Sequence, residues 1–109
     1  MVKLNIKPLS VNKAWKGKRF KTEDYKRYER NCLLLLPKLT IPADNLRLSI
    51  VFGVSNKAND IDNGLKPIID ILQKKYDFND SRIYELNVRK EITKKGYEFI
   101  LFEIEGIIT

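Results

Sequence analysis

The middle of the chain reads LRLSIVFGV from Leu46 to Val54. Apolar side chains occupy every second position of this stretch, which is the period of a β-strand with one buried face. This is the longest alternation of its kind in the chain. We therefore expect residues 46–54 to form a central strand of a sheet.

A helix is expected shortly after this strand, behind a polar loop at residues 55–59. Pro67 lacks an amide hydrogen and fits only the first turn of a helix, which places the N-cap at Asn63 or Gly64. One apolar face then follows the helical period, at i, i+3, i+4 and i+7. Its members are Leu65, Ile68, Ile69 and Leu72.

The flanking segments complete an α+β pattern. Residues 2–6 and 84–88 alternate as strands, Thr22 is a good N-cap for a helix that ends at Leu36, and residues 9–21 lack any period and predict a basic loop. Residues 93–96 predict a hairpin turn that leads into a strand over residues 97–104. The expected fold is a single domain, residues 1–109, of order βαβαββ, with a four-stranded mixed sheet and two helices.

The chain is basic and contains no histidine. Its 109 residues carry a net charge of +7, and residues 1–40 hold 11 lysines and arginines against three acidic residues. Such asymmetry favours a nucleic-acid partner for the N-terminal part, although a generally solvated basic surface gives the same count. No stretch has the length of a membrane span or a signal peptide, so we expect a cytoplasmic protein. Cys32 is the only cysteine, which excludes an internal disulfide and a zinc site and predicts a buried thiol.

Three aspartates form the most informative cluster. Asp60 and Asp62 are two residues apart, where the central strand gives way to the helix, and Asp80 precedes the next strand. In an extended segment Asp60 and Asp62 would point the same way with Ile61 packed inward, and Asp80 could close on the same spot. Crowded carboxylates need a cation between them, and oxygen ligands suit Mg²⁺, for which Mn²⁺ can substitute.

Lys66 lies four residues beyond Asp62 and four before Asp70. Its ammonium could stabilise a phosphate under attack, or it could simply form an i,i+4 ion pair with Asp70. The two interpretations are compatible, because Asp70 could hold the lysine in place. Asn63 fits either an N-cap or a partner of the metal's waters, and Asp70 fits a supporting role better than ligation.

Aromatic residues accompany the N-terminal cations. Trp15 and Phe20 fit stacking on bases as well as they fit a core. Tyr25 and Tyr28 share a helical face with Cys32, which favours core packing.

The segment DIDNGLKPIIDIL, residues 60–72, followed by NDSRI at residues 79–83, resembles the RusA family of Holliday junction resolvases. The family pattern is D-x-D-N-x-x-K-x-x-x-D-x-L, followed by D-D or N-D at the next strand. Residues 10–15, SVNKAW, are similar to the family's early segment. The likeness covers roughly residues 3–105. Where members often carry a basic residue or proline before the first aspartate, this chain has Lys57-Ala58-Asn59.

The resemblance implies a Mg²⁺-dependent endonuclease that acts as a homodimer on four-way DNA junctions. It implies Asp60, Asp62 and Asp80 as metal ligands and Lys66 as the catalytic lysine. From their positions in the sequence, Asn63 and Asp70 are expected to support these residues. The residues expected to bind DNA are Asn12, Lys13, Trp15, Lys16, Lys18, Arg19, Lys21 and Lys57. Two alternatives remain open at this point: a DNA-binding module without catalysis, and a metal-dependent nuclease for other branched or flapped nucleic acid or for RNA.

Overall fold

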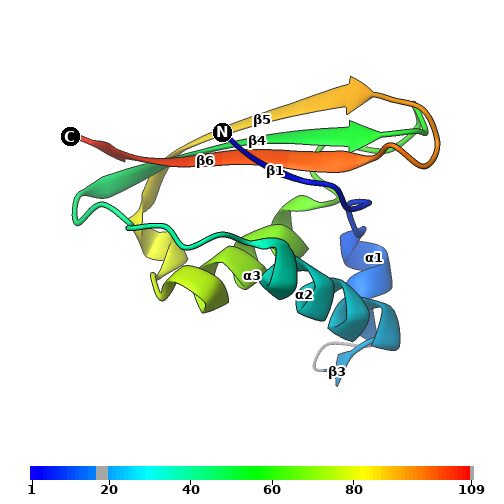
Figure 1. Cartoon of the computed structure of the whole chain (residues 1–109), viewed down its shortest axis with the longest axis horizontal. Helices are drawn as coiled ribbons and strands as arrows, with labels where there is room; N and C mark the ends of the chain where they lie inside the picture. Colours follow the sequence, from blue (N-terminus) through cyan, green and yellow to red (C-terminus); the bar gives the residue numbers. More distant parts are fainter. Residues whose placement is uncertain (17–19, 109) are drawn as a thin grey trace.

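One four-stranded sheet and the helices packed on one of its faces make up the structure, a computed structural model that describes residues 1–16 and 20–108 (Figure 1). The main elements are β1 (Val2–Leu4), α2 (Glu23–Leu35), β4 (Asn45–Val54), α3 (Leu65–Tyr76), β5 (Ile83–Ile92) and β6 (Phe99–Ile107). The shorter ones are α1 (Val11–Ala14), β2 (Trp15–Lys16), β3 (Phe20–Lys21) and the 3-10 turn η1 (Asp80–Arg82). The predicted α+β class and the order βαβαββ of the main elements are confirmed.

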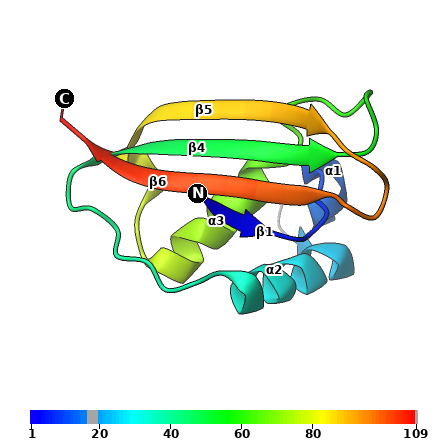
Figure 2. The same cartoon turned by 45° about the horizontal axis from the view of Figure 1, so that its top comes forward.

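The strand predicted to be central is central. The sheet order is β1-β6-β4-β5, and β4 runs parallel to β5 and antiparallel to β6. The alternating residues of β4 from Leu46 to Phe52 are buried, because they face the helices. Figure 2 shows α2 and α3 on the same side of the sheet.

The hairpin predicted at residues 93–96 is wrong. Gly96 has the positive φ of 93° expected in a turn, but β5 and β6 do not pair, since β4 lies between them. The connection instead passes the end of β4, where the Thr93 amide donates to the Val54 carbonyl at 2.8 Å. β5 is consequently an edge strand, parallel to the strand from which α3 departs.

Both predicted helices form with the expected starts. The Thr22 hydroxyl accepts a hydrogen bond from the Tyr25 amide and caps α2. α3 begins at Leu65 behind Gly64, with Pro67 in its first turn. The buried face of α3 differs from the prediction, because Ile71 is fully buried whereas Leu65 and Ile69 are only partly buried.

The basic loop predicted over residues 9–21 is also corrected. It contains the short helix α1 and the small ladder of β2 with β3, fastened to α2 by the Thr22 hydroxyl, which donates to the Lys13 carbonyl at 2.5 Å. Next to it, Tyr25, Tyr28 and Cys32 belong to the core as predicted, and burial raises the pKa of the Cys32 thiol to about 12.

Within the described part of the chain, no helix is long and apolar enough to cross a membrane. The cytoplasmic location stays a prediction.

Candidate functional site

The Asp60–Asn63 segment lies between the end of β4 and the start of α3. It is a turn: the Asn63 amide donates to the Asp60 carbonyl at 3.2 Å, and the Leu65 amide donates to the Asp62 carbonyl at 3.1 Å. The expectation of an extended segment is therefore wrong, and Ile61 is 46% exposed instead of packed inward. Both carboxylates are exposed, and Asp62 immediately precedes the helix entry, where orphan amides favour negative charge.

Asn63 acts through its backbone. Gly64 is the N-cap of α3, without a side-chain cap, so Asn63 does not cap the helix. Its carbonyl accepts a hydrogen bond from the Val11 amide at 2.8 Å. This bond ties the turn to the start of α1, whose Asn12 and Lys13 are exposed.

Lys66 and Asp70 form the predicted i,i+4 ion pair on α3. The ammonium and the carboxylate are 3.4 Å apart, with side chains 59% and 30% exposed. An exposed pair of this kind contributes only about 0.3–0.5 kcal/mol to stability. Its geometric effect is larger, because it restricts where the ammonium can reach from the first turn of the helix.

A residue that the sequence did not single out holds the loop before Asp60. Lys90, near the end of β5, donates to the carbonyls of Lys57 and Asn59 at 3.0 and 2.8 Å. These bonds fix the chain immediately before Asp60 to the sheet. A lysine in an alternating strand gives no signal of this role, because its partners are backbone carbonyls of a distant loop.

Asp80 lies at the other end of α3. Its amide donates to the side-chain oxygen of Gln73 at 2.9 Å, and the Asn79 side chain caps the turn η1 by accepting from the Ser81 amide. Gln73 is the second positioning residue that the sequence did not indicate. Because β4 and β5 are parallel, the start of β5 lies beside the start of β4, away from Asp60.

The structure thus brings Asp60, Asp62 and Lys66 to one end of α3 and leaves Asp80 at the other. The 12 residues of α3 span roughly 18 Å at 1.5 Å per residue. Among residues 1–16 and 20–108, no three acidic or cysteine side chains gather as ligands of one ion. Asp80 therefore does not close on Asp60 and Asp62 within one chain.

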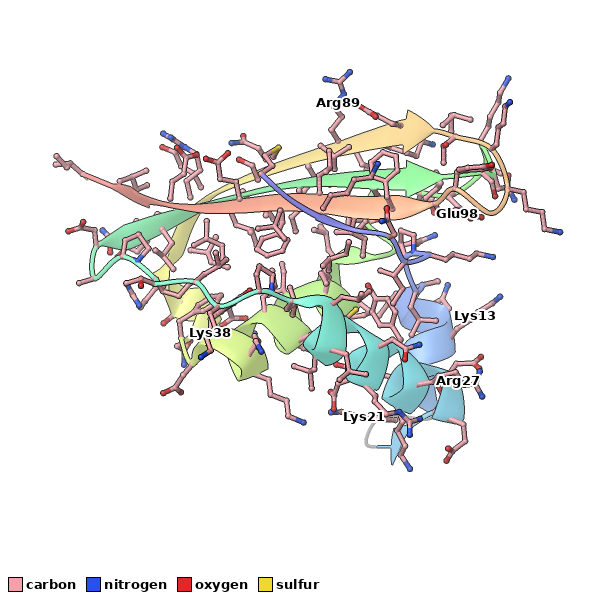
Figure 3. All side chains as sticks on the ribbon, viewed as in Figure 1. Lys13, Lys21, Arg27, Lys38, Arg89 and Glu98 are labelled. Carbon is pink, nitrogen blue, oxygen red and sulfur yellow. The ribbon has the colours of Figure 1, made fainter. Side chains whose placement is uncertain are left out.

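The expected DNA-binding residues are only partly described. Figure 3 shows Lys13 and Lys21 near α1 and the start of α2, away from Lys38, which follows the end of α2. The Lys21 ammonium is 3.1 Å from Glu29 and 4.8 Å from the centre of the Tyr25 ring, so it is already engaged. Burial raises the pKa of Glu29, but hydrogen bonds from Lys74 and Lys21 outweigh it and lower that pKa overall. Lys57 is exposed, whereas Lys18, Arg19 and the side chains of Trp15, Lys16 and Phe20 lie outside the described residues.

In comparisons with known proteins, no family model and no curated protein matches the chain.

Proposed function

We propose that this protein is a Mg²⁺-dependent endonuclease that cleaves branched DNA, four-way junctions in particular, as a homodimer. The observation that carries the proposal is the pair of exposed carboxylates, Asp60 and Asp62, at the entry of the helix that bears Lys66. The likeness of residues 60–72 and 79–83 to the resolvase pattern supports the same assignment. A basic N-terminal region suits a polyanionic substrate.

The donor set fits Mg²⁺, which commonly takes one or two carboxylates and fills its other positions with water and substrate phosphate oxygens. A Mg²⁺ ion held by Asp60 and Asp62 would supply Lewis-acid polarisation of a phosphodiester and an activated water. The chain's own contributions are the ammonium of Lys66, which would stabilise charge developing on the phosphate, and Asp70, which orients that ammonium. Lys90 holds the loop before Asp60 against the end of the sheet through its two hydrogen bonds.

In the proposed homodimer, Asp80 of each subunit contributes to the cleavage site of the other subunit. In the described chain β5 pairs only with β4, so its outer edge is open along ten residues. Edges of this length readily add another strand. An antiparallel pairing of β5 with itself reverses one strand relative to the other, so the partner's Asp80 would approach the end of β5 that Lys90 links to the Asp60 loop.

Charge indicates the register of such a pairing. With the two-fold axis at Asn87, Glu85 lies opposite the partner's Arg89, and Leu86 lies opposite the partner's Val88. Figure 3 shows Arg89 pointing away from the helices, and Leu86 is 44% exposed at the open edge. Moving the axis to Val88 would place Glu85 against the partner's Glu91, two like charges that repel. The dimer built this way is two-fold symmetric, as is an open four-way junction.

The direct test is a cleavage panel of a four-way junction, a linear duplex, a flap, a single strand and a matched RNA, each with Mg²⁺ and with EDTA. We expect Mg²⁺-dependent cleavage that is strongest on the junction. Cleavage that is strongest on the flap or the RNA would assign a different nucleic acid. Binding without cleavage of any substrate would favour the module without catalysis.

Neutralising four cations of the N-terminal region should weaken binding to every DNA shape. The changes are Lys16→Gln, Lys18→Gln, Arg19→Gln and Lys21→Gln. The salt dependence of binding should flatten by about one unit of slope for each cation that no longer neutralises a phosphate. Lys21 should contribute least, since it is paired with Glu29.

Binding titrations at several salt concentrations in EDTA measure this effect. The control is a triple variant of exposed cations outside residues 16–21, Arg30→Gln, Lys38→Gln and Lys75→Gln. Equal weakening per removed charge in the two variants would mean that residues 16–21 have no special part in binding.

A further inference from the structure

A cavity of about 540 Å³ lies beside the Asp60 turn. Two segments far apart in the sequence form most of it: residues 7–13, and the end of β4 with residues 55–64. Its apolar surface includes Phe52 and Val54, which are 3% and 7% exposed. Asp60 lines the same cavity, so the space opens directly next to the proposed cleavage site.

Four asparagines contribute carboxamide groups to the polar part of the lining. Asn12, Asn56, Asn59 and Asn63 all border the cavity. The Asn56 side chain already accepts a hydrogen bond from the Ala58 amide at 2.9 Å. The side-chain amides of Asn12 and Asn59, by contrast, make no hydrogen bond to any described residue. A carboxamide offers both a donor and an acceptor, which is the combination that reads the edge of a nucleobase.

Several of the charged side chains that line the cavity already have ion-pair or hydrogen-bond partners within the chain. Its two carboxylates other than Asp60 have partners: Asp24 pairs with Arg27 at 3.6 Å, and Glu98 accepts hydrogen bonds from the Ser55 hydroxyl and the Gly96 amide. Lys90 is committed to the loop carbonyls. Lys13 is exposed and has no ion pair with a described residue. Lys7 is exposed and interacts electrostatically with Glu98, without a close ion pair. The ammonium groups of both lysines can face a phosphate.

We propose that this cavity binds one unstacked deoxynucleotide of the DNA substrate. The base enters over Phe52 and Val54, the amides of Asn12 and Asn59 contact its hydrogen-bonding edge, and Lys7 and Lys13 contact the adjacent phosphate. A branch point supplies such a nucleotide at low cost, because its bases are the least constrained by stacking. The inference rests on the proposed function and adds to it a base-reading site next to the cut.

The test uses junctions with 2-aminopurine, a base that fluoresces when it is unstacked, at each position around the branch point. Wild-type protein in EDTA should brighten one position on each strand of a symmetry-related pair. Asn12→Ala with Asn59→Ala should remove that signal and weaken junction binding roughly tenfold, the usual scale for removing amide hydrogen bonds to a base. Asn31→Ala, which removes an exposed amide on α2, should change neither.

A second variant guards against misfolding of the first. Lys13→Gln changes an exposed side chain, and it should weaken junction binding while leaving the position of the bright base unchanged. If wild-type protein cleaves junctions but brightens no position, the nucleotide site is refuted and the nuclease proposal stands. If it brightens one position but cleaves nothing in Mg²⁺, the nucleotide site stands and the nuclease proposal fails.

Discussion

Asp62→Asn and Asp80→Asn should each lower junction cleavage in Mg²⁺ by orders of magnitude. Each change keeps the shape of the side chain but replaces a charged carboxylate oxygen, the proposed Mg²⁺ ligand, with a neutral amide oxygen, which Mg²⁺ binds poorly. Both side chains are exposed, and neither supports the core. Folding should therefore be unaffected, and the decrease should come from weaker Mg²⁺ binding at the cleavage site. Single-turnover cleavage measures it.

Binding to the junction in EDTA should persist in both variants. It should tighten slightly, because one negative charge that faces the phosphates is gone. Lys66→Ala is the informative comparison: it should retain Mg²⁺ binding, measured by thermal shift, and still slow cleavage. Cleavage near the wild-type rate by Asp62→Asn or Asp80→Asn would remove that aspartate from catalysis.

Local pattern was enough to predict the elements of this fold, because each follows from the period of its own side chains. The alternation over residues 46–54 produced β4, and Pro67 located the start of α3 to within one residue. The prediction missed Ile71 because the buried face of α3 is rotated to residues 67, 68, 71 and 72, away from the predicted stripe at residues 65, 68, 69 and 72. The rotation depends on how α3 packs against its neighbours, which the period of its own side chains does not show.

The arrangement of strands did not follow from local pattern. Residues 83–92 and 99–107 are separated by a turn with a suitable glycine, which is also the signature of a hairpin. In the structure β5 and β6 both pair with β4 instead of with each other. That pairing depends on long-range packing. The same pairing makes β5 parallel to β4 and carries Asp80 away from Asp60, so the error about the hairpin and the error about Asp80 have one physical origin.

The sequence predicted the residue types of the candidate site, but it did not indicate the residues that hold the site in position. Aspartates and a lysine in a spaced motif are visible in a sequence. Lys90 and Gln73 are not, because each acts on backbone groups of a segment that only the fold brings near. The cavity beside Asp60 combines residues 7–13 with residues 52–64, a juxtaposition that depends on how the N-terminal segment passes over the end of β4.

Mixing the two inactive variants should restore part of the activity if Asp80 acts across a dimer. In a mixed dimer of Asp62→Asn and Asp80→Asn subunits, one site receives both substitutions and the other receives Asp62 from one chain and Asp80 from its partner. Random exchange of subunits makes half of the dimers mixed, so nicking of one junction strand should recover to about one quarter of the wild-type level. If each site is built from a single chain, every site stays defective and nothing recovers.

The matched control mixes Asp60→Asn with Asp62→Asn. These two positions lie in one turn of the same chain, so no exchange of subunits can produce an intact pair, and this mixture should stay inactive. Refolding the variants together ensures exchange, and size-exclusion chromatography with light scattering checks that dimers form. A monomeric mass at micromolar concentration, both free and on junction DNA, would refute the shared site. Dimers without recovery would place Asp80 outside the site that holds Asp60 and Asp62, because only a contribution across the interface produces recovery in one mixture and not in the other.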